Sequence, residues 1–317
     1  IHALRKAAPD AHITMLVDEK LKDVVLFNPY LDEVVTIDKK GRDNSILSLW
    51  ACSRHLSKLD FDVLINLHPN ERCSFIDAMT SVRLRTGTTH KIFKWFWDVF
   101  TPLDRSMHAA DMYLDVLQQL GVQDLSNNGL EIFPGEEHFL EAELFWQEQN
   151  ITDQDKLIGF NIGSAVPTKR WPPERFAEVA DIFAAKGYRT VFFGGPMDEE
   201  MVAEATGYMQ TRPIIATGHF AIGGLAAAMR RCCLIITNDS GPMHVAISQK
   251  VPIVAMYGPS NPKLYGPYTK DAVIVTAQPP CQGCADGMKH SCDDLQCMSR
   301  MTVEQVVAAA DTIMLNK

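Results

Sequence analysis

The chain has 317 residues, 46% of them apolar and 22% charged, which is the composition of a globular protein and excludes a disordered or fibrous one. Its formal net charge of −9 argues against nucleic acid as the main partner, because a general polyanion binder is basic. Eight cysteines are too few for a disulfide-stapled scaffold and favour a reducing compartment, so we expect a cytoplasmic protein. No run of the sequence reaches the roughly 18 apolar residues of a membrane-spanning helix.

The first half alternates short apolar runs with helical stretches. Residues 1–8 have the pattern of the last turns of a helix, so we expect a further element upstream of Ile1. Strands are predicted at 12–17, 33–37, 61–67 and 82–87, and helices at 19–26, 44–59, 71–80 and 108–120. A strand followed repeatedly by a helix builds a parallel sheet that is covered by helices.

The second half repeats this alternation after a polar helix and connection over 134–156. Strands are predicted at 157–162, 190–193, 234–237, 251–256 and 272–275, and helices at 172–186, 225–231, 241–249 and 302–315. These strands are apolar throughout, as parallel strands buried on both faces are. We therefore expect an α/β protein of two doubly wound domains, residues 1–150 and 151–300. A C-terminal helix, 301–317, follows and can cross back to the first domain.

The polar turn after the strand at 234–237 is the first candidate site, because ligands of such sheets bind at the carboxyl ends of strands. It contains Asp239 and Ser240 and opens a helix at Gly241. Backbone N–H groups at a helix N-terminus bind anions, and a glycine there lets a ligand approach closely. His244, in the first turn, can donate to the same anion. The alternative is a structural turn with Asp239 or Ser240 as an N-cap.

Two further loops follow predicted strands. Residues 163–170 include Lys169 and Arg170, and two cations at the end of a strand suit a phosphate, with a solvated basic loop as the alternative. Asp198 and Glu199 open the next helix, where a contact with ribose hydroxyls competes with simple capping of the helix dipole. The chain has neither a Walker loop nor a Gly-x-Gly-x-x-Gly motif, which argues against a dinucleotide enzyme.

These motifs occur together in one family. The segments 168–172, 194–196, 238–246 and 257–262 resemble, in their order and spacing, the bacterial ADP-heptose:lipopolysaccharide heptosyltransferases, glycosyltransferase family 9. The resemblance covers nearly the whole chain and is most specific over residues 159–268. It implies a GT-B fold, with two Rossmann-like domains facing a cleft and the donor bound mainly by the second. It also implies inverting transfer of a heptose from ADP-heptose to a lipopolysaccharide inner-core glycolipid.

The resemblance further implies roles for individual residues at the donor. Ser164 and Lys169 would face the donor phosphates or sugar, and Asp239 would hold sugar hydroxyls. The backbone N–H groups of Ser240 and Gly241 would bind the diphosphate.

Four more positions complete the donor site that the resemblance implies. His244 would stand beside the diphosphate, and Asp198 or Glu199 matches the acid near the ribose. Phe220 falls at the apolar contact with the adenine, and a core aromatic is the alternative for it.

Two departures from the family limit what can be carried over. The catalytic base of the family is an Asp after its first strand, which would lie upstream of Ile1, so we assign no base. Many members carry Glu where this chain has Gly224, which leaves the fine donor specificity open.

The cysteines at 281, 284, 292 and 297 form the one dense cysteine group of the sequence. Four thiolates could close a zinc site, but only one Cys-x2-Cys pair is present, so reduced or loop-stapling cysteines are favoured. We expect neither a metal nor a cofactor, because the donor loops offer cations and N–H groups instead of the carboxylates that hold Mg²⁺.

The stretch 91–100 carries five aromatic residues and two lysines. A core helix is one interpretation. The other is an edge that makes a transient contact with the inner membrane near a glycolipid acceptor, which would place the protein peripherally on its cytoplasmic face. For the activity, two alternatives stay open beside the glycosyltransferase: a sugar-nucleotide epimerase of the same fold, and a non-catalytic sugar-nucleotide-binding module.

Overall fold

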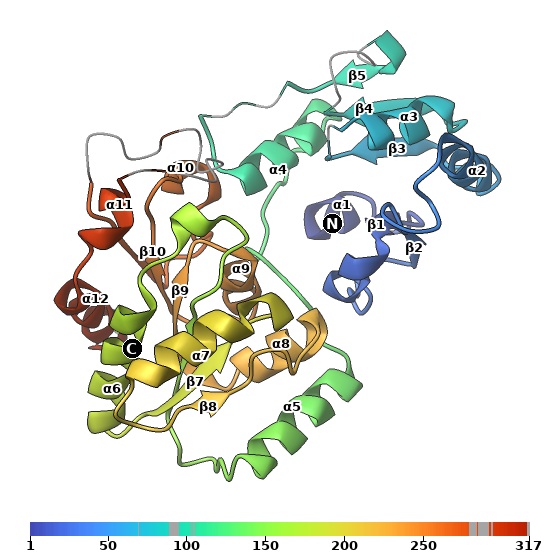
Figure 1. Ribbon diagram of the computed structural model, residues 1–317. Coiled ribbons are helices and arrows are strands. Elements are labelled where there is room, and N and C mark those ends of the chain that lie inside the picture. Colours follow the sequence, from blue (N-terminus) through green and yellow to red (C-terminus); the bar gives the residue numbers. More distant parts are fainter. Residues whose placement is uncertain are drawn as a thin grey trace. The chain divides into compact units, whose positions relative to one another are not determined.

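The computed structural model describes residues 1–68, 70–88, 95–102, 104, 106–278, 284, 292 and 294–315. The chain divides into two compact units, Ile1–Asn127 and Asn128–Lys317. Every strand pair between described residues is parallel, and helices connect most of the strands (Figure 1). The predicted α/β class is therefore confirmed.

The first unit contains two small sheets instead of the single sheet expected. One pairs β1 (Thr14–Asp18) with β2 (Glu33–Ile37), and the other has the order β3 (Val63–Asn66), β4 (Leu84–Gly87), β5 (Val99–Phe100). The helices are α1 (His2–Ala7), the 3₁₀ helix η1 (Glu19–Val24), α2 (Ile46–Ser57), α3 (Glu71–Met79) and α4 (Ala109–Gln119). Ser45 starts α2 with a capping box, since its hydroxyl accepts from the Ser48 N–H.

The second unit contains one six-stranded parallel sheet in the order β11-β10-β9-β6-β7-β8. Its strands are β6 (Leu157–Asn161), β7 (Arg189–Phe193), β8 (Ile214–Ile215), β9 (Cys232–Asn238), β10 (Ile253–Met256) and β11 (Ala272–Val275). Its helices are α5 (Glu136–Glu148), η3 (Pro167–Lys169), α6 (Pro173–Ala185), η4 (Pro196–Asp198), α7 (Glu199–Tyr208), α8 (Ile222–Met229), α9 (Gly241–Ser248), α10 (Pro262–Tyr265), α11 (Gln296–Ser299) and α12 (Val303–Leu315).

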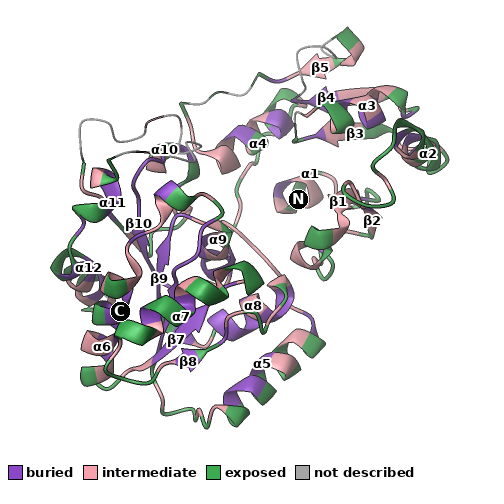
Figure 2. Ribbon diagram, in the orientation of Figure 1, coloured by how far each residue is buried: buried purple, intermediate pink, exposed green. Residues whose placement is uncertain are grey.

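Apolar residues on both faces of this sheet explain its uniformly apolar strands. Side chains alternate between the faces of a strand, so Leu234 and Ile236 of β9 join one core cluster with α6 and α12. Ile235 joins the other cluster, with α8 and α9. Figure 2 shows the resulting band of buried residues along the strands. The central strands are thereby buried on both sides, which leaves their carboxyl ends as the accessible polar edge.

Packing of α5 explains why the two units divide earlier in the chain than residue 150. Phe145 and Trp146 of α5 are buried in the core of the second unit, and α5 contacts α8. A Cβ on Gly223 would lie 2.2 Å from the His138 ring, and one on Gly224 would lie 2.2 Å from a carboxylate oxygen of Glu141. The two glycines let α5 approach α8 closely, so the second unit begins at Asn128.

The C-terminal helix also belongs to the second unit. α12 packs on β11 and α6, and Val306 and Ala310 are fully buried in the cluster between them. The Trp171 indole N–H donates to the Met301 carbonyl oxygen at 3.1 Å just before α12 begins. The helix 301–317 of the sequence analysis is thus α12, part of the compact unit Asn128–Lys317. No helix in the described part of the chain is long and apolar enough to span a bilayer.

Candidate functional site

Three loops meet at the carboxyl edge of the large sheet. β6, β9 and β10 lie side by side, so the segments after Asn161, Asn238 and Met256 leave the sheet next to one another. Side chains cross-link them: the Asn238 amide donates to the Ile162 carbonyl oxygen at 2.6 Å and accepts from the Trp171 N–H at 3.1 Å. The sheet thus brings the loops at 163–170 and 239–241 together, although they are far apart in sequence.

Asp239 is the centre of this edge. Its buried carboxylate pairs through Oδ2 with the Lys169 ammonium at 2.8 Å, and the Ser260 hydroxyl donates to the same oxygen. The Ser164 hydroxyl donates to the Asp239 backbone carbonyl at 3.3 Å. Lys169 is therefore held in a largely buried ion pair with Asp239, and the alternative of a solvated basic loop does not apply to it.

Tyr257 supports Asp239 from inside the protein. It is fully buried, and its hydroxyl donates to the Tyr265 carbonyl oxygen at 2.8 Å. Burial raises the pKa of Tyr257, and the nearby Asp239 carboxylate raises it further, so the phenol stays neutral. The phenol thus adds no negative charge beside Asp239, whose carboxylate is offset by Lys169.

The start of α9 is open beside this pair. Ser240 occupies the N-cap position, but its side chain makes no capping hydrogen bond. Among the described residues, the backbone N–H groups of Ser240 and Gly241 donate to no acceptor, and Pro242 has no N–H. A Cβ on Gly241 would meet nothing within 4 Å, so a ligand can approach this backbone. His244 lies half-buried in the first turn of the same helix.

Asp198 and Glu199 have different surroundings. The Asp198 carboxylate accepts from the Gly195 N–H at 2.9 Å and lies against Gly163, where a Cβ would be only 2.1 Å from it. Capping therefore accounts for Asp198, although the contact with Gly163 also holds it at the end of β6. Glu199 is exposed and directs its carboxylate to Gly218, where a Cβ would be 2.8 Å away.

Phe220 packs against the hydrophobic core of the second unit. Its ring meets that of Phe145 edge-on, with centroids 5.1 Å apart, and lies 4.6 Å from the His219 ring. It is nevertheless only half-buried, so one part of the ring remains accessible. The adenine contact expected for it stays a prediction.

Three residues of this edge received no individual role from the sequence, although Asn238 and Ser260 lie in the motif segments 238–246 and 257–262. Asn161 and Asn238 end adjacent strands and organise the loops by hydrogen bonds, and Ser260 contacts the Asp239 carboxylate. An Asn at the end of an otherwise apolar strand was the available signal for the first two. For Ser260, only the tertiary structure brings the hydroxyl to Asp239.

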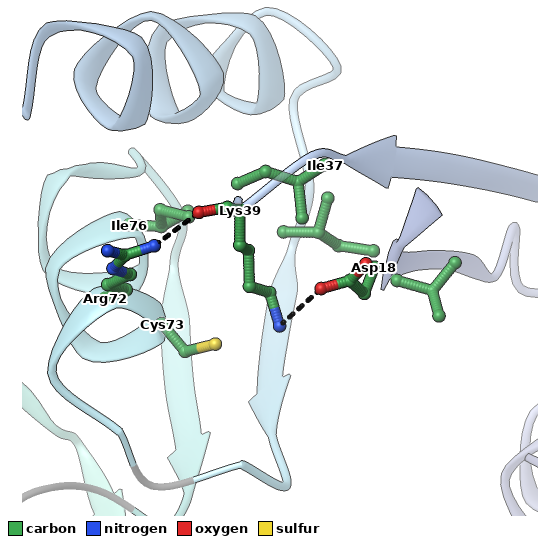
Figure 3. Close-up of a pocket in the computed structure, with 8 residues that line it drawn as sticks. Asp18, Ile37, Lys39, Arg72, Cys73 and Ile76 are labelled. Carbon is green, nitrogen blue, oxygen red and sulfur yellow. Dashed lines mark hydrogen bonds and ion pairs between the residues drawn. The ribbon is translucent and has the colours of Figure 1, made fainter. Parts of the chain in front are cut away.

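The first unit has a small cavity at the carboxyl ends of β1 and β2 (Figure 3). Its accessible volume of about 40 Å³ holds no more than a few water molecules. Arg72 donates to the Lys39 carbonyl oxygen at 2.6 Å, and the Lys39 ammonium lies 3.9 Å from Asp18. Because Lys39 is paired with Asp18 and Arg72 donates to a backbone carbonyl, we assign the cavity no ligand.

The cysteine group lies only partly within the described residues. Cys297 is buried in the core, and its sulfur is 3.1 Å from where a Cβ on Gly258 would lie. Cys284 and Cys292 are half-buried, and Cys281 lies outside the described residues. Where the structure describes the chain, no three His, Cys, Asp or Glu side chains could hold a metal ion together.

The aromatic stretch at 91–100 is also partly described, since residues 91–94 lie outside the described residues. Trp95 is 76% exposed and stacks on Phe96, and β5 begins at Val99. The core-helix interpretation is thus wrong for residues 95–100, because the chain there turns into a strand.

Comparisons with known proteins agree with this architecture. The family model "Glycosyltransferase family 9 (heptosyltransferase)" matches residues 49–292. A crystal structure of a glycosyl transferase family 9 protein from Veillonella parvula is 52% identical, with a TM-score of 0.94 over 100% of this chain and 92% of that one. The structure of E. coli ADP-heptose lps heptosyltransferase II is 20% identical, with a TM-score of 0.77 over 99% of this chain and 93% of that one.

A curated relative gives the same family. Lipopolysaccharide heptosyltransferase 3 of Escherichia coli K12 is 23% identical over 288 residues, which cover 86% of this chain and 81% of the relative. The fold is that of the GT-B heptosyltransferases. Since the family model covers most of the chain, including the loops around Lys169 and Asp239, the chain is a glycosyltransferase and belongs to glycosyltransferase family 9, the heptosyltransferases.

Proposed function

We propose that this enzyme transfers a heptose from ADP-heptose to a lipopolysaccharide inner-core sugar, with inversion and without a metal ion. The observation that carries the proposal is the uncapped N-terminus of α9 beside the Lys169–Asp239 pair. A diphosphate needs both fixed N–H donors and a cation, and this edge offers both. The name of the E. coli heptosyltransferase that shares the fold points to ADP-heptose as the donor.

The donor half of the reaction follows from these groups. The N–H groups of Ser240 and Gly241 and the Lys169 ammonium would hold the diphosphate and stabilise the charge that develops as it leaves. Asp239, fixed by Lys169 and Ser260, would accept hydrogen bonds from sugar hydroxyls. Inversion requires attack by the acceptor hydroxyl from the opposite side while a general base removes its proton. We assign this base to no residue of the chain.

The composition of the donor edge favours a reaction without a metal ion. Enzymes that neutralise a diphosphate with Mg²⁺ hold the ion with several carboxylates. The protein groups that we propose to bind the phosphates are backbone N–H donors, Lys169 and His244. Asp239 is the one acid among these proposed groups. Transfer should therefore proceed in excess EDTA, and a rate that falls more than about tenfold and returns with Mg²⁺ or Mn²⁺ would overturn this part of the proposal.

For the acceptor, we propose a glycolipid that is met at the inner-membrane surface. Trp95 presents an exposed aromatic ring of the kind that enters the membrane interface. The proposed test is binding to lipid vesicles, with Trp95→Ser expected to weaken it and Tyr208→Ser, at an exposed aromatic in α7, as the control. Equal binding of both variants would remove Trp95 from the proposal.

The decisive experiment is a transfer assay with a panel of nucleotide sugars and a lipopolysaccharide-core acceptor, followed by mass analysis of the product. A mass gain of one heptose, obtained with ADP-heptose and not with UDP-sugars, is the expected result. An epimerised sugar formed without acceptor would favour an isomerase instead. Donor binding without turnover, in a chain extended upstream of Ile1, would favour a binding module.

A further inference from the structure

A hydrogen bond between two loops holds the Ser240 hydroxyl away from the start of α9. Asn161, the last residue of β6, is only 1% exposed. Its side-chain amide nitrogen donates to the Ser240 hydroxyl oxygen at 2.8 Å and to the Thr237 hydroxyl oxygen at 3.1 Å. The Ser240 hydroxyl in turn donates to the Asn238 carbonyl oxygen at 3.3 Å. The proton and one of the two lone pairs of this hydroxyl are thus used on the side of the sheet, which holds its oxygen there.

A serine at the N-cap ordinarily behaves differently. Its hydroxyl oxygen accepts from an N–H of the first helical turn and so lies over the helix N-terminus. An oxygen in that place would occupy the position of an anion bound by the same helix end. Ser240 has an extended backbone and makes no such bond, and the space above Gly241 is open. Pro242 has no N–H, so the N–H of Met243, which donates to the Ser240 carbonyl oxygen at 3.2 Å, is the one that a Ser240 cap would use. The interaction with Asn161 therefore keeps the hydroxyl oxygen out of the space in front of the Ser240 and Gly241 N–H groups, where a ligand would lie.

In this arrangement Asn161 keeps one buried polar atom without a hydrogen bond to the described residues. Its side-chain carbonyl oxygen is buried and has no hydrogen-bond partner in the described part of the chain. An unpaired buried carbonyl destabilises a fold, and an apolar side chain would avoid the penalty. The amide nitrogen donates to the hydroxyls of both Thr237 and Ser240. The presence of an Asn at this buried position is therefore explained by the two hydroxyls that it holds in place.

We infer that Asn161 is a positioning residue for donor binding: it keeps the Ser240 hydroxyl from capping α9, so that the helix N-terminus can bind the diphosphate. This inference rests on the proposed function, since it takes the diphosphate site to be at Ser240 and Gly241. Asn161 does not touch the donor in this scheme. It acts through the rotamer of Ser240.

The test is a double-mutant cycle measured by calorimetric titration of ADP into the full chain. Asn161→Ala frees the Ser240 hydroxyl to cap α9 and should weaken ADP binding about fivefold to tenfold, in line with the usual strength of a cap. In the Ser240→Ala background no hydroxyl remains to cap the helix. The same Asn161→Ala substitution should then change the ADP affinity by less than about twofold.

Thr237→Val is the matched control, because it removes the other acceptor of the Asn161 amide and leaves Ser240 alone. It should keep the wild-type ADP affinity. The inference is overturned if Asn161→Ala binds ADP normally, if the loss is as large in the Ser240→Ala background, or if Thr237→Val causes the same loss. Asn161→Ser, too short to reach Ser240, gives the same readout if Asn161→Ala does not fold. Absence of ADP binding by the wild-type chain would instead overturn the proposed function itself.

Discussion

The Lys169 ammonium lies 2.8 Å from the Asp239 carboxylate, with both side chains largely withdrawn from solvent. The two residues come from loops that follow neighbouring strands, β6 and β9. A pair at this depth is screened less than a surface pair, so the loss of either partner leaves an uncompensated charge. Lys169 therefore balances Asp239 within the protein and is also the cation that we propose for the diphosphate.

Lys169→Ala should weaken ADP binding by about 1.5–3 kcal/mol, the range for hydrogen bonds to charged groups. It should also lower the melting temperature, because Asp239 then keeps its charge without its cation. Titration calorimetry and thermal denaturation measure the two effects. Lys263→Ala, at an exposed lysine in α10, is the control and should change neither. Unchanged ADP affinity in Lys169→Ala would exclude Lys169 from the donor site.

Gly163→Ala should destabilise the second unit by about 1–3 kcal/mol, because the new methyl group collides with the Asp198 carboxylate. The contact holds the loop after β6 against the start of η4, so the expected loss should shrink when Asp198→Ala is added. Denaturant unfolding of the single and double variants checks this. Gly207→Ala in α7, where a Cβ meets nothing within 4 Å, is the control and should be neutral or slightly stabilising. Equal stability of the two single variants would contradict the steric argument.

The stability of the first unit should fall as the pH rises from 5 to 8. Burial raises the pKa of Asp77 to about 7, with Asn66 donating to its carboxylate and Arg85 nearby, both of which oppose the rise. Between the ordinary carboxyl pKa of 3.8 and this value, the folded state binds a proton that the unfolded state releases. Rising pH therefore removes stability, by about 2–3 kcal/mol between pH 5 and 8.

Asp77→Asn should abolish most of this pH dependence, because the amide keeps the shape and does not ionise. Urea denaturation at pH 5 and pH 8 compares the variant with the wild type. Asp62→Asn removes an exposed carboxylate and should leave the wild-type dependence intact. If the fall in stability is the same in all three proteins, Asp77 is not its source.

Protein purified without chelators should contain well under one zinc per chain. Cys297, one of the four candidate ligands, is buried in the core and packs against the loop at Gly258. Elemental analysis measures the zinc content, and transfer activity after chelation tests its relevance. Stoichiometric zinc with activity lost on chelation would show that the cysteine group is a metal site after all.

Local patterns in the sequence determine most of the elements. The apolar runs at 157–162, 234–237 and 272–275 become β6, β9 and β11, because the strands of a helix-covered parallel sheet carry mostly apolar side chains, with polar ones such as Asn161 and Asn238 at the strand ends. The turn residues from Asp239 to Gly241 do connect β9 to α9. The sequence thus determines where strands end and helices begin, and with that the sheet edge at which a ligand can bind.

The tertiary structure alone decides which side chains at that edge meet. The pairing of β6 with β9 brings Lys169 to Asp239 and Asn161 to Ser240, contacts between segments that no local pattern relates. Helix packing likewise decides the unit boundary: α5 joins the second unit because Gly223 and Gly224 admit its side chains. Such contacts depend on strand order and close approach, which are properties of the whole sheet and not of any short stretch of sequence.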